Sequence, residues 1–412
     1  MTLFTERNWI LKRSAQCFFI FLVAGFVLLT LAYAVPNDWI LENGETSIAM
    51  VKEEYRNDPA REWSGMFNNP ANTINYGFDR KFIQRALIED SSLNAMEAAM
   101  SVNNYARYWH GYQVFVRPML AVGTYENMVY VSVLVFFLLM IYCFIKLRER
   151  LGTAFALAFF FTLYAVRIMA TSLCLNNSGC FIVAMALMLA VLKLSNTPNE
   201  KWLYPLFLLA GMVVNYIDVL TAPMVSLCLP LAVHLSILLS EGREDLKENL
   251  TDTVALPVFW AVGWGLFWAC KWLIGSLVLG RNLITDAVEQ AGIRIVGEAA
   301  YDTSPLGAIT ANLAVIFPDD RLTQVMVLVI VLALAALLLL YHKNWKTLWR
   351  GLPLFIVALS PFLWMAVLSN HSQIHAPFVF RILSVSIFAS LCFVIHGVDK
   401  TKLPGGKRGK AL

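Results

Sequence analysis

Charged residues are scarce in this chain of 412 residues: they make up 15% of it, while 58% of the residues are hydrophobic. An ordinary soluble domain carries about one quarter charged residues. The composition, with a mean hydropathy of +0.63, therefore excludes a soluble globular protein and indicates that lipid is the solvent. Basic residues fall in short segments between apolar runs, without the single basic face of a nucleic-acid-binding protein. No nucleic-acid partner is expected.

Metal-binding cysteine motifs are also missing. The seven cysteines form no CxxC pair and no Cys/His cluster with zinc spacing. Five lie inside apolar runs and are interpreted as small packing residues: Cys17, Cys143, Cys228, Cys270 and Cys392. Cys174 and Cys180 differ because they bracket the polar stretch LNNSG at the expected outer end of a helical hairpin. The sequence is compatible there with a disulfide and with two free thiols.

Long apolar runs dominate what is present. A helix needs about 20 mostly apolar residues to cross a hydrocarbon core of about 30 Å. The sequence predicts an all-α integral membrane protein with about ten spans, at residues 14–35, 127–147, 152–171, 178–195, 202–217, 222–240, 254–279, 323–342, 352–369 and 379–397. The fifth is short and runs into Asn215 and Asp218. Residues 32–34 form an A-x-A-like signal-peptide site. The apolar run 14–35 is longer than the about 7 to 15 residues of a signal-peptide h-region, so we expect a retained first span.

Basic residues orient these spans. Lysine and arginine in short connections mark the cytoplasmic side of a membrane, and every such cluster falls on the same side of the predicted spans: 7–13, 146–150, 193–201, 243–247, 343–350 and 400–410. We therefore expect a multi-pass protein of the plasma membrane with a cytoplasmic N terminus (1–13) and a basic cytoplasmic tail (398–412). A long external loop at 36–126 is then followed by spans 2–7 (127–279). A second one at 280–322 is followed by spans 8–10 (323–397).

The first external loop reads as helical. Residues 48–55 and 82–100 mix apolar and polar residues at helical spacing, and the Asn/Gly/Pro-rich stretch 64–77 between them reads as irregular. We expect amphipathic helices that lie on the membrane surface.

Ionisable residues near spans are costly, so each one is a functional hypothesis. Arg167, Asp218 and Lys271 are all predicted at the outer leaflet, whereas His234 lies in the inner half and is interpreted as structural. Four segments concentrate such residues at the outer level: AVPNDWILEN with Asp38 and Glu42, NNYARYWHGYQVFVRP with Arg107, His110 and Arg117, NYIDVLTAP with Asp218, and SNHSQIHAPFVFR with His371, His375 and Arg381.

Two less specific interpretations apply to these segments. His371 and His375 have the four-residue spacing that places two imidazoles on one helix face for a metal, but no HExxH glutamate lies between them and Pro377 shortens any helix. No metal ligand is therefore assigned. The aromatic and arginine residues of ARYWHGY are also typical of an interfacial belt. Convergence of four distant segments on one leaflet favours a single site.

At these residues the sequence resembles a group of bacterial membrane proteins that look like GT-C-type glycosyltransferases, which take sugar from a polyprenyl-phosphate carrier. The resemblance rests on RYWHGYQVFVRP, NYIDVLTAP and SNHSQIH followed by FVFR. It implies a large helical first external loop and a second external loop after span 7, the two places where this chain has its long loops. The chain departs from the group's acidic motifs. The acidic pair after the first span appears here only as Asp38 with Glu42. In the middle of the first loop, where the group has an Asp-rich motif, the sequence NNPANTINYGFDRKF leaves Asp79 as the nearest candidate.

The resemblance implies an inverting transfer to a cell-envelope acceptor. A carboxylate would deprotonate the acceptor hydroxyl, for which Asp38 is the first candidate and Asp79 the second. Arg107, Arg117 and Arg381 would bind the phosphate, aided by His110, His371 and His375, while Asp218 would orient a cation or a sugar hydroxyl. Participation of a divalent cation stays open.

Two other functions fit the composition. A transporter or flippase for a lipid-linked or anionic substrate predicts internal repeats and broken helices at mid-membrane depth, and the sequence has neither pattern. A non-catalytic scaffold predicts polar exposed loops instead of charges gathered at span ends. The sugar, the acceptor and the oligomeric state have no sequence signature.

Overall fold

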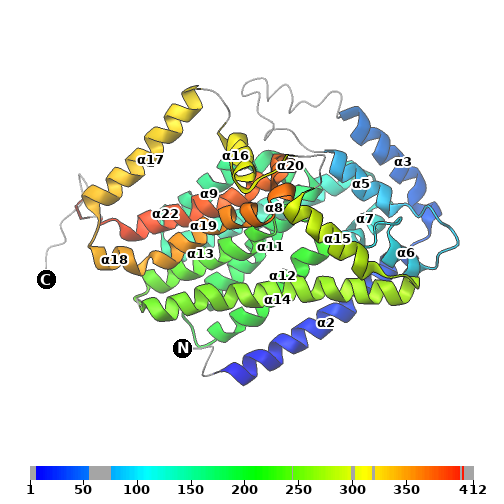
Figure 1. Cartoon of the computed structure of the whole chain (residues 1–412), viewed down its shortest axis with the longest axis horizontal. Coiled ribbons are helices and arrows are strands. Elements are labelled where there is room, and N and C mark those ends of the chain that lie inside the picture. The colour runs from blue at the N-terminus through cyan, green and yellow to red at the C-terminus, as the bar shows by residue number, and fades with distance from the viewer. Residues whose placement is uncertain are drawn as a thin grey trace.

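The computed structural model describes residues 6–54, 76–243, 245–297, 302–317, 321–399 and 401–402, and in this part of the chain every regular element is a helix. The one β-type contact there is an isolated bridge between His342 and Val398. The expectation of an all-α fold is therefore confirmed (Figure 1).

The helices follow the predicted order. The first long helix, α2 (Arg7–Ala34), is followed by α3 (Asn37–Glu54), α5 (Tyr76–Ala86), α6 (Ala95–Ser101) and α7 (Gln113–Leu120). The next group comprises α8 (Tyr125–Leu151), α9 (Thr153–Ala165), α10 (Ile168–Ser172), α11 (Leu175–Leu194), η2 (Glu200–Trp202), α12 (Leu203–Ile217), α13 (Met224–Ser240) and α14 (Leu246–Leu279). The last comprises α15 (Leu283–Val296), α16 (Pro305–Ile316), α17 (Arg321–Tyr341), α18 (Trp345–Arg350), α19 (Leu352–Val367), α20 (Ser369–Ile374), α21 (Ala376–Val379), η3 (Phe380–Ile382) and α22 (Leu383–Gly397).

Five helical stretches of the described chain are long and apolar enough to cross a membrane: Arg7–Ala34, Tyr125–Leu151, Leu175–Leu194, Leu246–Leu279 and Ala376–Gly397. The other predicted spans fall on α9 with α10, α12, α13, α17 and α19. The outward faces of the long helices are apolar, and Ile20 and Leu277 leave 70% and 83% of their surface exposed. Such faces suit hydrocarbon and not water.

One predicted span is interrupted. The helix expected over 152–171 breaks at Arg167, which has a left-handed φ of 59°, and resumes as α10. The Thr171 hydroxyl donates to the Val166 carbonyl oxygen at the break, at 3.2 Å, and also lies 3.0 Å from the Arg167 carbonyl oxygen.

The first loop also differs in detail. The predicted helix 48–55 is the end of a longer α3, and the predicted helix 82–100 is two helices, α5 and α6. Asn94 starts α6 with a capping box, in which it accepts from the Glu97 amide and Glu97 bonds back. Residues 55–75, which hold most of the irregular stretch 64–77, lie outside the described residues.

The bundle has two distinct ends (Figure 1). Helices α3, α5, α6, α7 and α15 gather at what we call the loop end, whereas α2 begins and α22 ends at the opposite, terminal end. At the terminal end Arg150 pairs with Glu241 at 2.9 Å and Arg243 pairs with Glu200 at 2.5 Å. His234 is buried there, 2.8 Å from the Ser195 hydroxyl, in agreement with a structural role.

Helices α12 and α14 lie in backbone contact. A Cβ atom on Gly211 would lie 2.1 Å from the Trp260 carbonyl oxygen, and one on Gly263 would lie 2.1 Å from the Leu208 carbonyl oxygen. Only glycine allows this approach at both positions. The contact fixes the loop-end turn after α12 relative to the tryptophans of α14.

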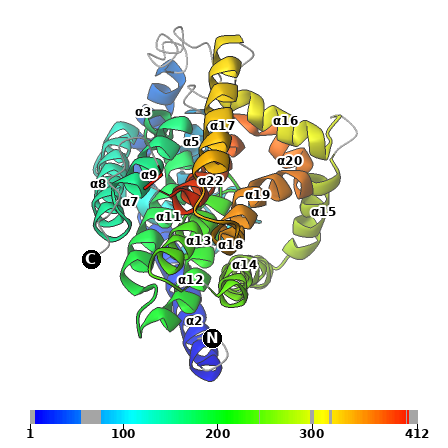
Figure 2. The same cartoon turned by 90° about the vertical axis from the view of Figure 1, so that its left-hand side faces the viewer.

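Helices α15 and α16 form an arch from the end of α14 to α20 (Figure 2). Ser369 of α20 donates to the Ile295 carbonyl at 3.1 Å, and Gln373 accepts from the Ser304 amide at 3.0 Å. The second long loop is thus held against the segment SNHSQIH.

Candidate functional site

The segment that follows α6 is strained and firmly held. Val102, Asn103 and Asn104 all have left-handed φ values, of 45°, 52° and 63°. A β-branched residue rarely adopts this conformation, and such strain persists only where the surroundings impose it. The buried Lys271 ammonium of α14 donates to the Met100 carbonyl at 2.9 Å, just before the turn.

Tryptophans of α14 hold the next residues. Trp268 and Trp272 both donate their indole N–H to the Arg107 carbonyl, at 2.6 Å and 3.0 Å. The Trp109 indole in turn donates to the Phe267 carbonyl at 2.9 Å. Hydrogen bonds to the rigid helix α14 therefore fix the position of the loop residues 105–110, as precise binding sites require.

Cations surround the tyrosines of this segment. The guanidinium carbons of Arg85 and Arg107 lie 4.3 Å and 4.4 Å from the centre of the Tyr105 ring. Tyr108 stacks on Tyr105 with ring centres 5.6 Å apart, and its hydroxyl accepts from Arg294 of α15 at 2.9 Å. Loop segments far apart in the sequence thus converge on two aromatic rings.

His110 is a neutral part of the same segment. It is fully buried, with Nε2 2.9 Å from the Tyr105 carbonyl oxygen and Nδ1 2.8 Å from the Tyr112 hydroxyl. Burial lowers the pKa of His110 far below its usual value, and the charges of Arg85, Lys271 and Arg107 lower it further. The imidazole therefore orients Tyr105 and Tyr112 and does not carry the positive charge expected of a phosphate ligand.

His371 and His375 lie close together, with ring centres 4.8 Å apart. Burial, the neighbouring His375 and Arg294 lower the pKa of His371 to about 3, and burial with the charges of Arg294 and Lys81 lowers that of His375 to about 4. His371 Nε2 donates to the Leu220 carbonyl at 2.7 Å. No group of three or more metal-ligating side chains occurs among the residues that the structure describes.

These shifts predict an acid-sensitive fold. Because the folded pKa of His375 is below its ordinary value of about 6.5, the stabilisation from the neutral ring is complete above about pH 6.5 and is lost as the pH falls towards about 4. We expect the unfolding midpoint of His375→Gln in nanodiscs to fall less over this interval than that of the wild type. Parallel curves would contradict the burial of an unprotonated ring.

Asp218 closes a tight turn beside these histidines. It accepts from the Thr221 amide at 2.9 Å and from the Thr221 hydroxyl, and Leu220 between them has a left-handed φ of 73°. Burial raises the pKa of Asp218 to about 6 despite these bonds. Besides burial, two charges shift the pKa of Tyr108: the Arg294 guanidinium lowers it and the Asp218 carboxylate raises it. Asp218 and Arg294 therefore both lie near the Tyr108 phenol.

We call this assembly the cationic cluster: Arg85, Tyr105, Arg107, Tyr108, Asp218, Asp286, Arg294, His371 and His375. Its only described ion pair joins Arg107 to Asp286 at 3.4 Å, and the Asp286 side chain is half exposed. No described carboxylate lies within ion-pair distance of Arg85 or Arg294. The cluster therefore has an excess of positive charge that favours an anion.

Two predicted phosphate ligands lie outside this cluster in the described contacts. Arg117 is fully buried and donates to the carbonyls of Ala32 at 2.8 Å, Val35 at 2.7 Å and Ala86. It thereby caps the ends of α2 and α5, where helices leave carbonyls unpaired. The expectation that Arg117 binds phosphate is corrected, because its guanidinium is occupied by backbone.

Arg381 is also enclosed. Its Nε donates to the Thr171 hydroxyl at 2.8 Å and its Nη1 to the Pro377 carbonyl at 3.1 Å. Its Nη2 is buried without a partner in the described structure. The residue ties α10 to η3, and none of its described contacts reaches Arg107 or Arg294.

The two predicted bases differ in environment. Asp38 is exposed in the first turn of α3. Asp79 is fully buried and accepts from the amides of Leu175 at 2.7 Å and Asn176 at 2.8 Å, from the Tyr125 hydroxyl at 2.6 Å and from the Cys174 thiol at 3.4 Å. It thus caps the start of α11 from a different helix. No disulfide joins Cys174 to Cys180, so the disulfide alternative is not adopted.

Asp79→Asn is expected to lower the free energy of unfolding by about 1–3 kcal/mol, because an amide presents one acceptor oxygen instead of two. Asp38→Asn is the matched control and should change it by less than about 0.5 kcal/mol. Thermal unfolding of both variants in nanodiscs measures this difference. Equal midpoints would contradict the capping role of Asp79.

Sequence reasoning missed Arg85, Asp286 and Arg294. Each lies in a predicted loop without a recognisable motif, and Arg294 meets Tyr108 across 186 positions of sequence. The only available signal was that Arg294 is the single basic residue between Arg281 and Arg321 in the sequence.

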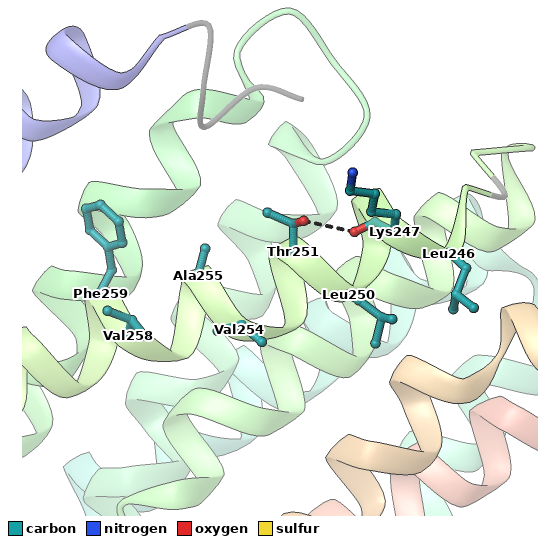
Figure 3. A pocket seen from close by; sticks show the side chains of 8 residues that line it. All are labelled: Leu246, Lys247, Leu250, Thr251, Val254, Ala255, Val258 and Phe259. Atoms are coloured by element: carbon teal, nitrogen blue, oxygen red, sulfur yellow. Dashed lines mark hydrogen bonds between the residues drawn. The ribbon is translucent and has the colours of Figure 1, made fainter.

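An apolar groove lies elsewhere, along α14 (Figure 3). It has a volume of about 790 Å³ and follows the first turns of α14 towards the terminal end. Its lining is Leu246, Lys247, Leu250, Thr251, Val254, Ala255, Val258 and Phe259, and the Thr251 hydroxyl is engaged by the Lys247 carbonyl at 2.8 Å. The lining has no acid–base pair, so this groove offers no reaction chemistry.

No protein-family model, curated protein or solved structure matches the chain. The functional argument therefore depends on the geometry of the cationic cluster.

Proposed function

We propose that this chain is a membrane glycosyltransferase that moves a sugar from a polyprenyl-phosphate carrier to a cell-envelope acceptor at the outer leaflet of the plasma membrane. In this proposal the ten predicted spans cross the membrane and both termini are cytoplasmic. The loop end faces outward, and the basic terminal end faces the cytoplasm. The proposal takes from the sequence resemblance a GT-C layout for these spans and loops.

The observation that carries the proposal is the positive excess of the cationic cluster. Arg107 and Arg294 approach the stacked rings of Tyr105 and Tyr108, and Arg294 has no described carboxylate partner. Guanidinium groups give phosphate two parallel hydrogen bonds, and aromatic faces suit a sugar ring or an apolar chain. A lipid phosphate linked to a sugar combines these features in one molecule.

We assign the general base to Asp218, in place of Asp38 or Asp79. Asp79 is committed to α11, and the described contacts of Asp38 do not reach the cluster. Asp218 is buried beside Tyr108, and its pKa of about 6 suits proton transfer near neutral pH. The acceptor hydroxyl gives its proton to Asp218, its oxygen bonds the anomeric carbon, and the bond to the carrier phosphate breaks on the opposite face, with inversion.

The departing phosphate gains negative charge in this step. Arg107 and Arg294 would stabilise that charge more strongly in the transition state than in the bound donor, which is the requirement for catalysis. No step in this scheme requires a divalent cation, although one could assist phosphate departure.

Transfer by the purified protein tests the proposal. The protein is placed in nanodiscs with a radiolabelled polyprenyl-phosphate sugar and a panel of cell-envelope glycans and lipids as acceptors. Label transferred to an acceptor with inverted configuration supports an enzyme. Donor that crosses the bilayer of proteoliposomes without chemical change would instead support a transporter or flippase and overturn the assignment.

A further inference from the structure

A ladder of four tryptophans follows α14. Trp260, Trp264, Trp268 and Trp272 recur every four residues, and successive ring centres lie 6.1 Å, 5.0 Å and 5.4 Å apart. At a helical rise of 1.5 Å per residue the ladder extends about 18 Å along the helix. We call these residues the tryptophan ladder.

The ladder is not an interfacial belt. A belt places tryptophan at one depth, near the lipid headgroups, whereas these rings are distributed along the helix axis. At about 100° per residue they lie on the side of α14 opposite to its exposed aliphatic residues Val262, Leu266 and Leu273, which are 46%, 50% and 53% exposed. The ladder therefore does not serve as the general lipid-facing surface.

Only the deepest ring is a fully packed core residue. Trp260 is 3% exposed and donates to the Ser226 hydroxyl at 3.0 Å. Trp264, Trp268 and Trp272 are each partly exposed, and Trp264 meets Trp364 of α19 with ring centres 6.3 Å apart. Partly open aromatic faces thus extend along α14 from Trp264, beside α19, to Trp268 and Trp272, beside the segment of Arg107 and Tyr108.

The ladder ends in the cationic cluster. Trp268 lies 5.2 Å from Tyr108 between ring centres, and the Tyr108 hydroxyl is the partner of Arg294. An apolar surface of considerable length is therefore continuous with an uncompensated positive site. A ligand that fits both parts has an extended apolar chain with a phosphate at one end.

We infer that the tryptophan ladder binds the isoprenoid tail of the lipid-phosphate donor, with the phosphate at Arg107 and Arg294 and the first isoprene units against Trp268 and Trp264. The inference rests on the proposed function for the identity of the donor. Methyl branches pack against indole faces at van der Waals distance, which adds dispersion energy along the chain.

A comparison of donors with long and short chains tests the inference. We expect Trp264→Leu to raise KM for a full-length polyprenyl-phosphate sugar about fivefold and to leave KM for a short, water-soluble analogue unchanged. Trp364→Leu on α19 should act in the same direction. The control is Trp349→Leu, because Trp349 of α18 is 63% exposed and lies far from the ladder in sequence and in described contacts.

A second readout does not depend on activity. Full-length polyprenyl phosphate with a photoreactive group in its chain is cross-linked to the wild-type protein in nanodiscs, and the labelled peptides are mapped. Adducts on residues 260–272 or on Trp364 support the inference, as does their loss on competition with unlabelled polyprenyl phosphate but not with phospholipid. Adducts elsewhere, displacement by phospholipid, or equal KM changes for both donors would overturn it. Absence of transfer with correctly placed adducts would contradict the proposed function alone.

Discussion

Asp218→Asn is expected to lower the rate of sugar transfer by about two to four orders of magnitude, the usual contribution of a general base. The amide cannot accept the proton of the acceptor hydroxyl. Because burial raises the pKa of Asp218 to about 6, activity of the wild type should rise with pH through about pH 6 as the carboxylate ionises. The measurement is kcat/KM between about pH 5 and 8.

Two controls separate catalysis from folding in this variant. The Asn oxygen can still accept from the Thr221 amide, and its NH2 group can donate to the Thr221 hydroxyl, which can turn to accept. The unfolding midpoint in nanodiscs should therefore stay close to that of the wild type, unlike that of Asp79→Asn, where both oxygens accept from backbone amides. Asp90→Asn, which changes an exposed carboxylate between α5 and α6, should retain full activity. If Asp218→Asn folds and keeps the rate and the pH profile of the wild type, Asp218 is not the general base.

Arg294→Gln is expected to weaken donor binding by about 10- to 100-fold, since a hydrogen bond to a charged group contributes about 1.5–3 kcal/mol. Arg294→Lys should recover part of this loss, because it restores the charge but not the planar fork that matches phosphate. Arg281→Gln is the matched control, since Arg281 is an exposed arginine before α15. An equal loss of donor binding in both glutamine variants would show that general surface charge, and not a specific contact of Arg294, attracts the donor.

Hydropathy predicted the helices well and the detailed contacts poorly. All ten apolar stretches fall on helices, because the length and composition of an apolar run are local properties. The break at Arg167 was missed because a left-handed residue inside an apolar run has no sequence signature when it is not glycine. The division of 82–100 was missed although Asn94 and Glu97 form a capping box.

The site shows why charged residues near spans mislead. Arg117 and Asp79 satisfied the rule that a costly charge marks function, yet each caps helices whose ends meet it only in three dimensions. His371, His375, Arg107 and Asp218 were predicted at one leaflet, and the structure brings them together. Arg294 was missed because its partner Tyr108 lies in the other long loop, and no single-sequence pattern links the two.

Binding of polyprenyl phosphate, compared with polyprenol of the same length, tests the central claim most directly. The two lipids differ only in the phosphate, so the comparison isolates the cationic cluster from the apolar surface. We predict that wild-type protein in nanodiscs binds the phosphate at least about tenfold more tightly than the alcohol. We also predict that Arg107→Gln with Arg294→Gln removes this preference while polyprenol binding stays unchanged. Equal affinity of the wild type for the two lipids would contradict the account.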